Sequence, residues 1–367
     1  MLKNSAKIIT RENADEIIEA ITVNGKLIVE SPQDYMKLCR LARAYSKAVK
    51  AMLKYVKQNT NHKTATKKLY DIIPNYMYLE TAYKQAKLIW EGLKANEGEI
   101  AHIRRLWIAS RGERLQKGNR NIKLIPYADF FLVKIRYPWD RTWIYAKAYF
   151  GERYLPLLCE LCKLSSQKQE SYGAIISFRS YPRIHIQVPL WLYLKHFSSP
   201  EPRGYGLLAG FDLNSDRINM VVIDGGRNII TTKTEWFEEA TVQGISRDKA
   251  TNLRLKALLR LIRYAREIGV DYLVFENLSQ IKSRKYLINP TANRKITRFA
   301  KRELLEHALL MGLRYDFMVV LISPRKTSRY ALKIRRKLGL DRHTASAYVI
   351  ALRGLRAINI YGCLSNV

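Results

Sequence analysis

The order of hydrophobic segments in the second half of the chain restricts the possible folds more than any other feature. Three strand-like runs, GLLAGFDL, INMVVIDG and NIITTKTEW, follow one another closely. Apolar spacing then predicts a helix over 247–268, a buried strand at DYLVFENL, a helix over 293–311, a strand at FMVVLIS and a last helix over 341–358. Gly269 predicts the end of the first of these helices.

Three consecutive strands followed by alternating helices and strands form the element order of an RNase H-like domain. The segment SSPEPRGYG, over 198–206, is rich in residues that interrupt regular structure and therefore predicts a domain boundary. We expect an α/β fold in which an RNase H-like domain occupies 204–358 and is followed by a tail over 359–367.

The beginning of the chain predicts a β-hairpin followed by a helix. Asn24-Gly25 lies between two β-branched runs over 18–30, and this dipeptide is typical of a tight hairpin turn. Ser31-Pro32 then provides a helix cap and a proline suited to the first helical position.

Helical spacing continues after this first helix and is later replaced by strand-like runs. Apolar and basic residues predict further helices over 66–93 and 99–115, and short extended segments follow Gly118. The early hairpin and the later strands are expected to form one β-barrel-like region interrupted by a helical insertion. The expected divisions are a first β-rich part over 1–30, the helical insertion over 31–118, and a second β-rich part over 119–200.

Charge indicates the class of partner. The chain has 64 Lys and Arg against 32 Asp and Glu, a formal net charge of +32, while 47% of its residues are hydrophobic. A folded protein with such an excess of cations favours a polyanionic partner, and nucleic acid fits better than a membrane surface. Four scattered cysteines favour a reducing compartment, and no run of about 18 apolar residues occurs, so we expect a cytoplasmic protein without a membrane span.

Two acidic residues stand at the ends of apolar runs. Asp212 lies in LLAGFDL and Glu276 ends YLVFE, and both strands are predicted to be buried. A single acid in such a position is more often a helix or turn cap. Two carboxylates that converge at one end of a sheet can hold Mg²⁺, which prefers oxygen ligands and leaves coordination sites for a substrate phosphate.

A third candidate lies at the start of the last helix, in LGLDRHTASAYVIALRGL. Asp341 and His343 open an alanine-rich helix, and its small residues allow it to lie close against the sheet. The helix would then bring its N-terminus beside the strand ends. An acid at a helix N-terminus is also favourable for the helix dipole alone.

These segments resemble a known family. GFDLN, VFENL, LISPRKTS and DRHTASAYVIA occur in the order and at the spacing of RuvC motifs I, II and III of the transposon-encoded TnpB (OrfB) proteins, which are related to the compact type V CRISPR effector nucleases. The resemblance covers 204–358. Upstream, the layout of the chain is similar to the wedge and recognition lobes of such proteins.

The resemblance implies that Asp212 and Glu276 are the first two metal-binding carboxylates of a nuclease centre. In the third motif, His343 stands where the family usually has an acid, and Asp341 lies two residues earlier. Either residue, or both, would complete the ligands of Mg²⁺ or Mn²⁺, since imidazole can ligate Mn²⁺ or act as a general base. The change is also compatible with an inactive site.

A second departure concerns zinc. Members of the family usually carry two Cys-x-x-Cys pairs before the third motif, whereas here Thr327-Ser328 leads to Asp341 without a cysteine. Cys159 and Cys162 form one such pair elsewhere, but a tetrahedral site needs further ligands. Structural zinc is not expected.

Two basic clusters that flank the expected site, the second of them just before the third motif, predict a nucleic-acid-binding surface. Acid-free runs of this kind are typical of phosphate contacts, although a solvated face has the same composition. The residues concerned are Lys282, Arg284, Lys285, Arg294, Lys295, Arg298, Lys301 and Arg302 in one run, and Lys333, Arg335, Arg336 and Lys337 in the other.

Tyrosines alternate with lysines in the helical block. Exposed members can stack on bases, whereas buried members would only pack between helices, and the sequence leaves both open. They are Tyr45, Tyr55, Tyr70, Tyr76, Tyr78 and Tyr83.

Taken together, these features predict a mobile-element-associated, RNA-guided DNA endonuclease that uses two-metal hydrolysis, with a guide RNA and a target DNA as its partners. A nuclease-inactive, RNA-guided DNA-binding regulator is the first alternative. A protein-guided RuvC-like resolvase or transposase is the second. The sequence leaves the oligomeric state open.

Overall fold

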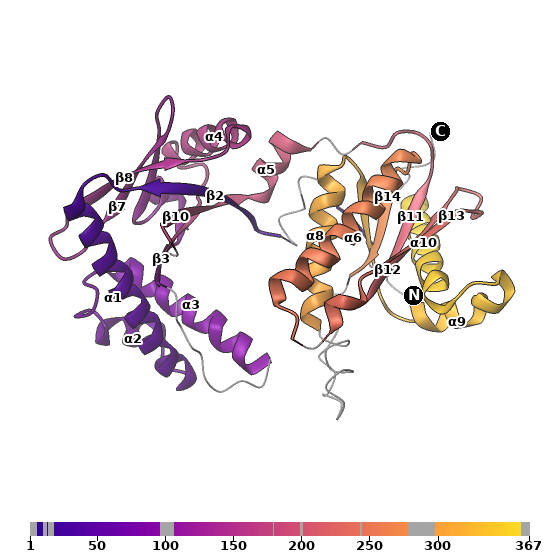
Figure 1. Cartoon of the computed structure of the whole chain (residues 1–367), viewed down its shortest axis with the longest axis horizontal. Helices are drawn as coiled ribbons and strands as arrows, with labels where there is room; N and C mark the ends of the chain where they lie inside the picture. The colour runs from indigo at the N-terminus through magenta and orange to yellow at the C-terminus, as the bar shows by residue number, and fades with distance from the viewer. Residues whose placement is uncertain are drawn as a thin grey trace. The chain divides into compact units, whose positions relative to one another are not determined.

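The chain divides into two compact units (Figure 1). One unit comprises residues 19–193, and the other comprises residues 1–18 together with 194–367. The computed structural model describes residues 6–9, 13, 18–95, 106–178, 180–198, 201–242, 244–277 and 298–360.

The unit of residues 19–193 is built on a seven-stranded antiparallel sheet in the order β3-β9-β10-β2-β8-β7-β6. The strand that precedes the helical insertion, β2, lies between β10 and β8, which both follow the insertion, so one sheet interrupted by helices is confirmed. The strands are β2 (Ala20–Ile28), β3 (Leu106–Ser110), β6 (Ile122–Pro126), β7 (Phe131–Arg136), β8 (Trp143–Tyr149), β9 (Gly173–Phe178) and β10 (Pro182–Pro189), with the short ribbon of β4 (Gly112–Glu113) and β5 (Gly118–Asn119). The helices are α1 (Pro32–Lys57), α2 (His62–Lys68), α3 (Tyr76–Ala95), α4 (Leu155–Ser166) and α5 (Leu190–Phe197), with 3-10 turns η2 (Arg114–Gln116) and η3 (Glu152–Tyr154).

The hairpin predicted at Asn24-Gly25 is wrong, because β2 runs straight through both residues. Gly25 pairs with Ile184 of β10 and is not among the glycines with positive φ. A Cβ atom at Gly25 would lie 2.6 Å from the ring of Phe150 and 2.9 Å from the carbonyl of Tyr149. The glycine is therefore needed for a close approach of neighbouring chain and not for a turn.

The helical insertion starts as predicted and then departs from the prediction. Ser31 caps α1 by accepting a hydrogen bond from the amide of Asp34. The single helix expected over 66–93 is broken into α2 and α3, since Pro74 removes a backbone donor and Asn75 caps α3 by accepting from the amide of Tyr78.

The helix predicted over 99–115 is wrong over its described part. Residues 106–110 form β3, which pairs with β9 along its whole length. The segment LWIAS carries aromatic and β-branched residues, and the available edge of β9 favours the extended form over the helical spacing. Residues 96–105 lie outside the described part of the chain.

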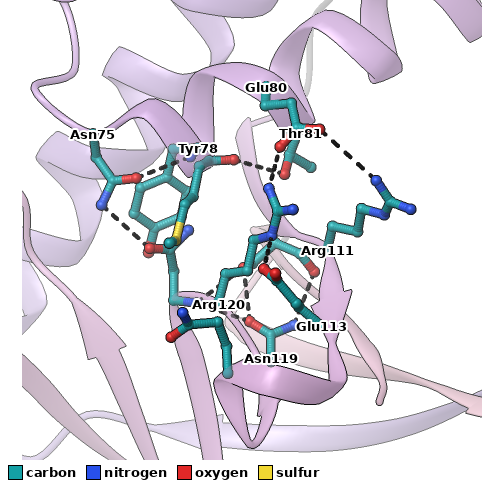
Figure 2. Close-up of polar contacts among 12 residues, drawn as sticks. Asn75, Tyr78, Glu80, Thr81, Arg111, Glu113, Asn119 and Arg120 are labelled. Carbon is teal, nitrogen blue, oxygen red and sulfur yellow. Dashed lines mark hydrogen bonds and ion pairs between the residues drawn. The ribbon is translucent and has the colours of Figure 1, made fainter. Parts of the chain in front are cut away.

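A polar network joins α3 to the segment between β3 and β6 (Figure 2). Glu80 of α3 accepts a hydrogen bond from Arg120 and also contacts Lys84 at 3.3 Å and Arg111 at 3.8 Å. Arg120 in turn donates to Glu113. Burial alone would raise the pKa of Glu80, but the hydrogen bond and charge of Arg120, with Lys84, hold that pKa below its usual 4.5.

Asn119 organises the sheet side of this junction. It is fully buried, and its amide nitrogen donates to the carbonyl oxygens of Ser110 and Tyr172 at 3.0 and 2.9 Å. Its amide oxygen accepts from the hydroxyl of Ser110 and from the backbone amides of Asn121 and Ile122. A buried amide with this many partners fixes the path of the chain between β5 and β6.

The second unit contains a six-stranded sheet in the order β1-β15-β14-β11-β12-β13. Its strands β11, β12 and β13 are antiparallel neighbours, whereas β14 and β15 run parallel to β11. This is the RNase H-like arrangement, so the predicted fold class is confirmed. The elements are β1 (Lys7–Ile9), β11 (Leu208–Leu213), β12 (Arg217–Ile223), β13 (Ile229–Trp236), η4 (Glu238–Thr241), α6 (Arg247–Glu267), β14 (Tyr272–Glu276), α8 (Arg298–Arg314), β15 (Met318–Ile322), α9 (Thr327–Leu338) and α10 (Arg342–Ile360).

Helices cover both faces of this sheet. The helices α6 and α8 contact each other and pack on one face, and α10 packs on the other (Figure 1). The predicted stop of α6 is confirmed, because Gly269 follows it with φ of +79°. Within the described residues, no helix combines the length and the apolar character that crossing a membrane requires.

The contact between α10 and β11 is a backbone contact. A Cβ atom at Gly210 would lie 2.2 Å from the carbonyl oxygen of Ala347 and 2.5 Å from the amide nitrogen of Ala351. Gly354, further along α10, lies against the side chain of Val274 on β14, where an added Cβ would be 2.4 Å away. The small residues of this helix thus allow it to lie directly on the strands, as the sequence predicts.

We expect Gly210→Ala to lower the free energy of unfolding by about 1 to 3 kcal/mol, because the added methyl group forces α10 away from β11. Gly92→Ala in α3 is the matched control, since nothing lies within 4 Å of an added Cβ there and a helical alanine is neutral or stabilising. Urea unfolding of the full chain compares the two variants. Equal midpoints for Gly210→Ala and the wild type would contradict the contact.

We expect Glu80→Gln to destabilise the unit of residues 19–193 by about 1 to 3 kcal/mol at pH 7. Because the folded-state pKa of Glu80 is lowered, its stabilising effect is present above the unfolded pKa and disappears as the pH falls through the folded value. Urea unfolding at pH 7 and at pH 3 measures this difference. Glu91→Gln, which removes an exposed ion pair with Lys87, should change stability by less than about 0.5 kcal/mol.

Candidate functional site

The strand ends bring Asp212 and Glu276 to the same edge and the same face of the sheet. In the parallel pair of β11 and β14, Phe211 is in register with Phe275, so the two acids occupy the next position on neighbouring strands. Gly210 and Val274, two residues earlier, both face α10. Because side chains alternate along a strand, both carboxylates emerge on the α10 side.

The N-terminal turn of α10 places His343 against Asp212. The Nδ1 atom of His343 lies 3.0 Å from Oδ2 of Asp212, and the same oxygen accepts a hydrogen bond of 2.9 Å from the amide of Asn214. The side chain of Asp212 is 15% exposed and that of His343 is 32% exposed. A histidine that is both held by a carboxylate and open to solvent can take or release a proton at a bound substrate.

Asn214 is a site residue that sequence reasoning missed. It belongs to the turn after β11, where its amide nitrogen donates to the Asp212 carboxylate and lies 3.2 Å from Nδ1 of His343. The signal was present in the segment GFDLN, where an amide follows the acid by two residues.

Asp341 acts as the cap of α10. Its Oδ1 accepts from the backbone amides of His343 and Thr344 at 2.8 and 3.2 Å, and its Oδ2 accepts from the Thr344 hydroxyl. Partial burial alone would raise the pKa of Asp341, but these hydrogen bonds hold it below its usual value. The structure therefore brings His343, and not Asp341, into contact with Asp212.

A buried amide lies beneath this turn. Asn219 of β12 is the cross-strand partner of Asp212 and donates to the hydroxyls of Thr234 and Thr344 at 2.8 and 3.4 Å. Its side-chain oxygen is buried and accepts no hydrogen bond from any residue that the structure describes. An unsatisfied buried oxygen beside a carboxylate is suited to a water molecule or a cation.

Arg353 contributes a positive charge on the Glu276 side. Its guanidinium donates to the carbonyl of Ser323 at 3.0 Å and to the hydroxyl of Thr327 at 2.8 Å. Burial lowers the pKa of Arg353, and the nearby charge of Glu276 opposes that effect. Sequence patterns give no indication of this residue, because it lies ten positions beyond the third motif's histidine on the same helix.

The donor atoms at the strand ends fit a divalent cation only in part. Asp212, Glu276 and Asn219 offer oxygen ligands of the kind that Mg²⁺ prefers. Within residues 6–9, 13, 18–95, 106–178, 180–198, 201–242, 244–277 and 298–360, however, no three His, Cys, Asp or Glu side chains gather closely enough to hold a metal ion by themselves. Any cation bound here would take its remaining ligands from water or from substrate.

The Cys159 and Cys162 pair lies on α4 and is not arranged for metal binding. Cys159 is exposed, whereas Cys162 is buried and donates from its thiol to the carbonyl of Leu124 at 3.4 Å. Burial raises the pKa of Cys162 to about 12, so its thiol stays protonated.

Basic residues of the second predicted cluster lie on α9. This helix packs on α10 through a small core of Ala331, Ala345 and Val349. Lys333, Arg336 and Lys337 are exposed, and Arg335 is partly exposed. Of the first cluster, Lys282, Arg284, Lys285, Arg294 and Lys295 lie outside the described residues, while Arg298, Lys301 and Arg302 are described only as backbone of α8.

The tyrosines of the helical block fall into two groups. Tyr45 and Tyr78 are fully buried between α1 and α3 with ring centroids 6.3 Å apart, so they serve packing. Tyr70 and Tyr76 are exposed, and Tyr55 and Tyr83 are partly buried.

Among the solved structures that align with the chain, one covers most of it and another covers less than half. The cryo-EM structure of a Cas12f1–sgRNA–target DNA complex aligns over 87% of this chain and 83% of its own chain, with a TM-score of 0.45 and 11% identity. The RuvC structure from Thermus thermophilus aligns over 42% of this chain and 96% of its own, with a TM-score of 0.31 and 14% identity. At these levels of similarity, the fold assignment rests on the strand order described above.

Sequence relatives give a firmer result. The model of the SSO2105 N-terminal domain matches residues 20–198. A protein from Aeropyrum pernix is 28% identical over 317 residues, which cover 80% of this chain and 83% of that protein. The protein SSO2105 of Saccharolobus solfataricus is 47% identical over 361 residues, which cover 96% of this chain and 97% of the relative. The chain therefore belongs to the SSO2105 family.

Proposed function

We propose that this protein is a metal-dependent nuclease of the TnpB type, guided by RNA to a DNA target. The observation that carries the proposal is the position of Asp212 and Glu276 on adjacent parallel strands, with His343 held against Asp212. The net charge of +32 supports a nucleic-acid partner. The resemblance to the RuvC motifs of TnpB proteins supports RNA guidance.

Asp212 and Glu276 would hold the divalent cation, Mg²⁺ or Mn²⁺, with the buried oxygen of Asn219 nearby. When bound, the cation polarises a phosphodiester and activates water for hydrolysis. Two carboxylates with open positions suit Mg²⁺, which usually keeps waters and substrate phosphate among its ligands.

His343 would work as the proton-handling group of the site. An Nδ1 proton donated to Oδ2 of Asp212 leaves Nε2 as an acceptor, so the imidazole can take a proton from attacking water. Asn214 holds the same carboxylate oxygen and thereby fixes its direction. Arg353 supplies a positive charge that balances Glu276 and favours an approaching phosphate.

A binding-only function is the second candidate, and one observation favours it. Both oxygens of Asp341 are used to cap α10, so this acid does not add a third carboxylate to the site in the described arrangement. A protein with this site would bind RNA and DNA without cutting. Cleavage assays with defined variants separate the two functions.

We expect Asp212→Asn and Glu276→Gln each to reduce DNA cleavage by at least about 100-fold, because each removes a cation ligand. Binding of the guide RNA, isolated by purifying the protein from its host, should stay within a few-fold of wild type, since neither change removes a basic residue. Asp248→Asn, an exposed acid in the first turn of α6, is the control and should cut normally. Full cleavage by Asp212→Asn with Mg²⁺ would disprove the nuclease assignment.

The roles of Asp341 and His343 are separable by substitution. We expect Asp341→Asn to preserve both the cap and cleavage, and Asp341→Ala to lose about 1 kcal/mol of stability because α10 loses its cap. We expect His343→Ala to lose cleavage while its melting temperature stays near that of wild type. Gel assays with Mg²⁺ and with Mn²⁺ measure cleavage. If Asp341→Asn is inactive and folded, Asp341 is a ligand; if the wild type never cuts with its RNA bound, the binding-only function holds.

A further inference from the structure

The strands β7 and β8 carry an exposed face of alternating aromatic and basic residues. We call the side chains of Lys134, Arg136, Trp143, Tyr145, Lys147 and Tyr149 the β7–β8 face. Register places Lys134 opposite Tyr145 and Arg136 opposite Trp143. The face therefore brings cations and rings together as cross-strand neighbours.

Alternation shows that this face is separate from the core of the sheet. Val133 and Ile135 of β7 and Ile144, Ala146 and Ala148 of β8 are buried, and the residues between them point to the other side. Tyr145 is 47% exposed and Tyr149 is 39% exposed. Large rings that the core does not need are thus left open to solvent.

The cations lie over the rings. The Nζ atom of Lys134 is 5.2 Å from the ring centre of Trp143 and 5.6 Å from that of Tyr145. The guanidinium of Arg136 is 5.2 Å from the ring centre of Trp143, which is its cross-strand partner on β8. These contacts hold flexible side chains in place and so lower the entropy cost of ordering them on binding.

The aromatic surface continues in the turn between β6 and β7. Tyr127 and Phe130 are stacked with ring centroids 5.1 Å apart and planes 4° apart, and Phe130 lies 6.2 Å from Tyr149. Lys147 is 5.2 Å from the Phe130 ring. Stacking faces therefore extend over both ends of β8.

Acidic residues neutralise only part of this face. Glu30 forms an ion pair with Lys147 at 2.7 Å, and Asp34 accepts from the backbone amide of Tyr145 at 3.2 Å. Across the described part of the chain, neither Lys134 nor Arg136 takes part in an ion pair with an acid. Lys134 and Arg136 are therefore available to an external anion.

We infer that the β7–β8 face binds a single-stranded segment of nucleic acid. Its unpaired bases would stack on Tyr145, Tyr149 and Trp143, and its phosphates would lie on Lys134 and Arg136. Every base has a π-face, and rings interleaved with cations match the alternation of base and phosphate along a strand. The inference rests on the proposed function, because it specifies how the partner nucleic acid is held.

The test is fluorescence anisotropy of a fluorescein-labelled 12-nucleotide oligouridine RNA with the full-length chain in EDTA. We expect the double variant Tyr145→Ala/Tyr149→Ala to bind at least about tenfold more weakly, with an unchanged salt dependence. Tyr145→Phe/Tyr149→Phe keeps the rings and should bind as the wild type does, and an unchanged urea-unfolding midpoint of the alanine variant excludes a folding defect. Tyr205→Ala removes a ring that is 67% exposed in the other unit and is the control.

The charged part of the face has its own readout. Lys134→Gln/Arg136→Gln should reduce the slope of log K against log salt by about 0.7 for each lost phosphate contact. DNA of the same length shows whether the 2′-hydroxyl matters, and a duplex should bind less tightly to this face because its bases are already stacked.

Equal affinity of Tyr145→Ala/Tyr149→Ala and wild type would overturn the inference, as would failure of the wild type to bind any single strand. Both measurements are made without metal, so they are independent of cleavage. Cleavage by the wild type is measured separately with Mg²⁺, so failure of this face and failure of the nuclease assignment are distinguishable.

Discussion

The direct contact between α10 and β11 is the constraint on which the site depends. Gly210 has no side chain, so the backbone of α10 lies on the strand, and Ala347 and Ala351 are small enough to allow it. The first turn of the helix is thereby carried to the end of β11, where His343 meets Asp212. A larger residue at the contact would separate Asp212 from His343, because a displaced helix carries its first turn with it.

The site also illustrates how a few carboxylates function in a strongly basic protein. Asp212 is held by Asn214 and His343, and Glu276 lies in the field of Arg353. Each acid thus has a hydrogen-bonding or positively charged neighbour within the site. The surrounding positive charge draws a polyanion toward the strand ends, where the acids alone would repel it.

Sequence reasoning predicted the elements of the RNase H-like sheet and its helices well because their signals are local. The apolar runs that end at Asp212 and Glu276 are enough to predict two buried strands, and Gly269 is enough to end α6. The turn prediction at Asn24-Gly25 failed because both residues pair with β10, more than 150 residues later in the chain, and this pairing overrides a local turn preference. Asp341 and His343 stayed ambiguous, since only three-dimensional packing shows which side chain turns toward the strand and which closes the helix.

The pairing of β1 with β15 gives this fold an unusual order of assembly. Lys7 lies opposite Leu321, so the first strand of the chain closes the edge of a sheet whose neighbouring strand is the last to be made. Roughly 300 residues must be synthesised between them, which takes on the order of 15 to 60 s at typical translation rates. During that time the unit of residues 19–193 can fold completely, while β1 remains attached to it without its partner. The RNase H-like sheet is therefore a late-folding structure, and its exposed β15 edge is protected only at the end of synthesis.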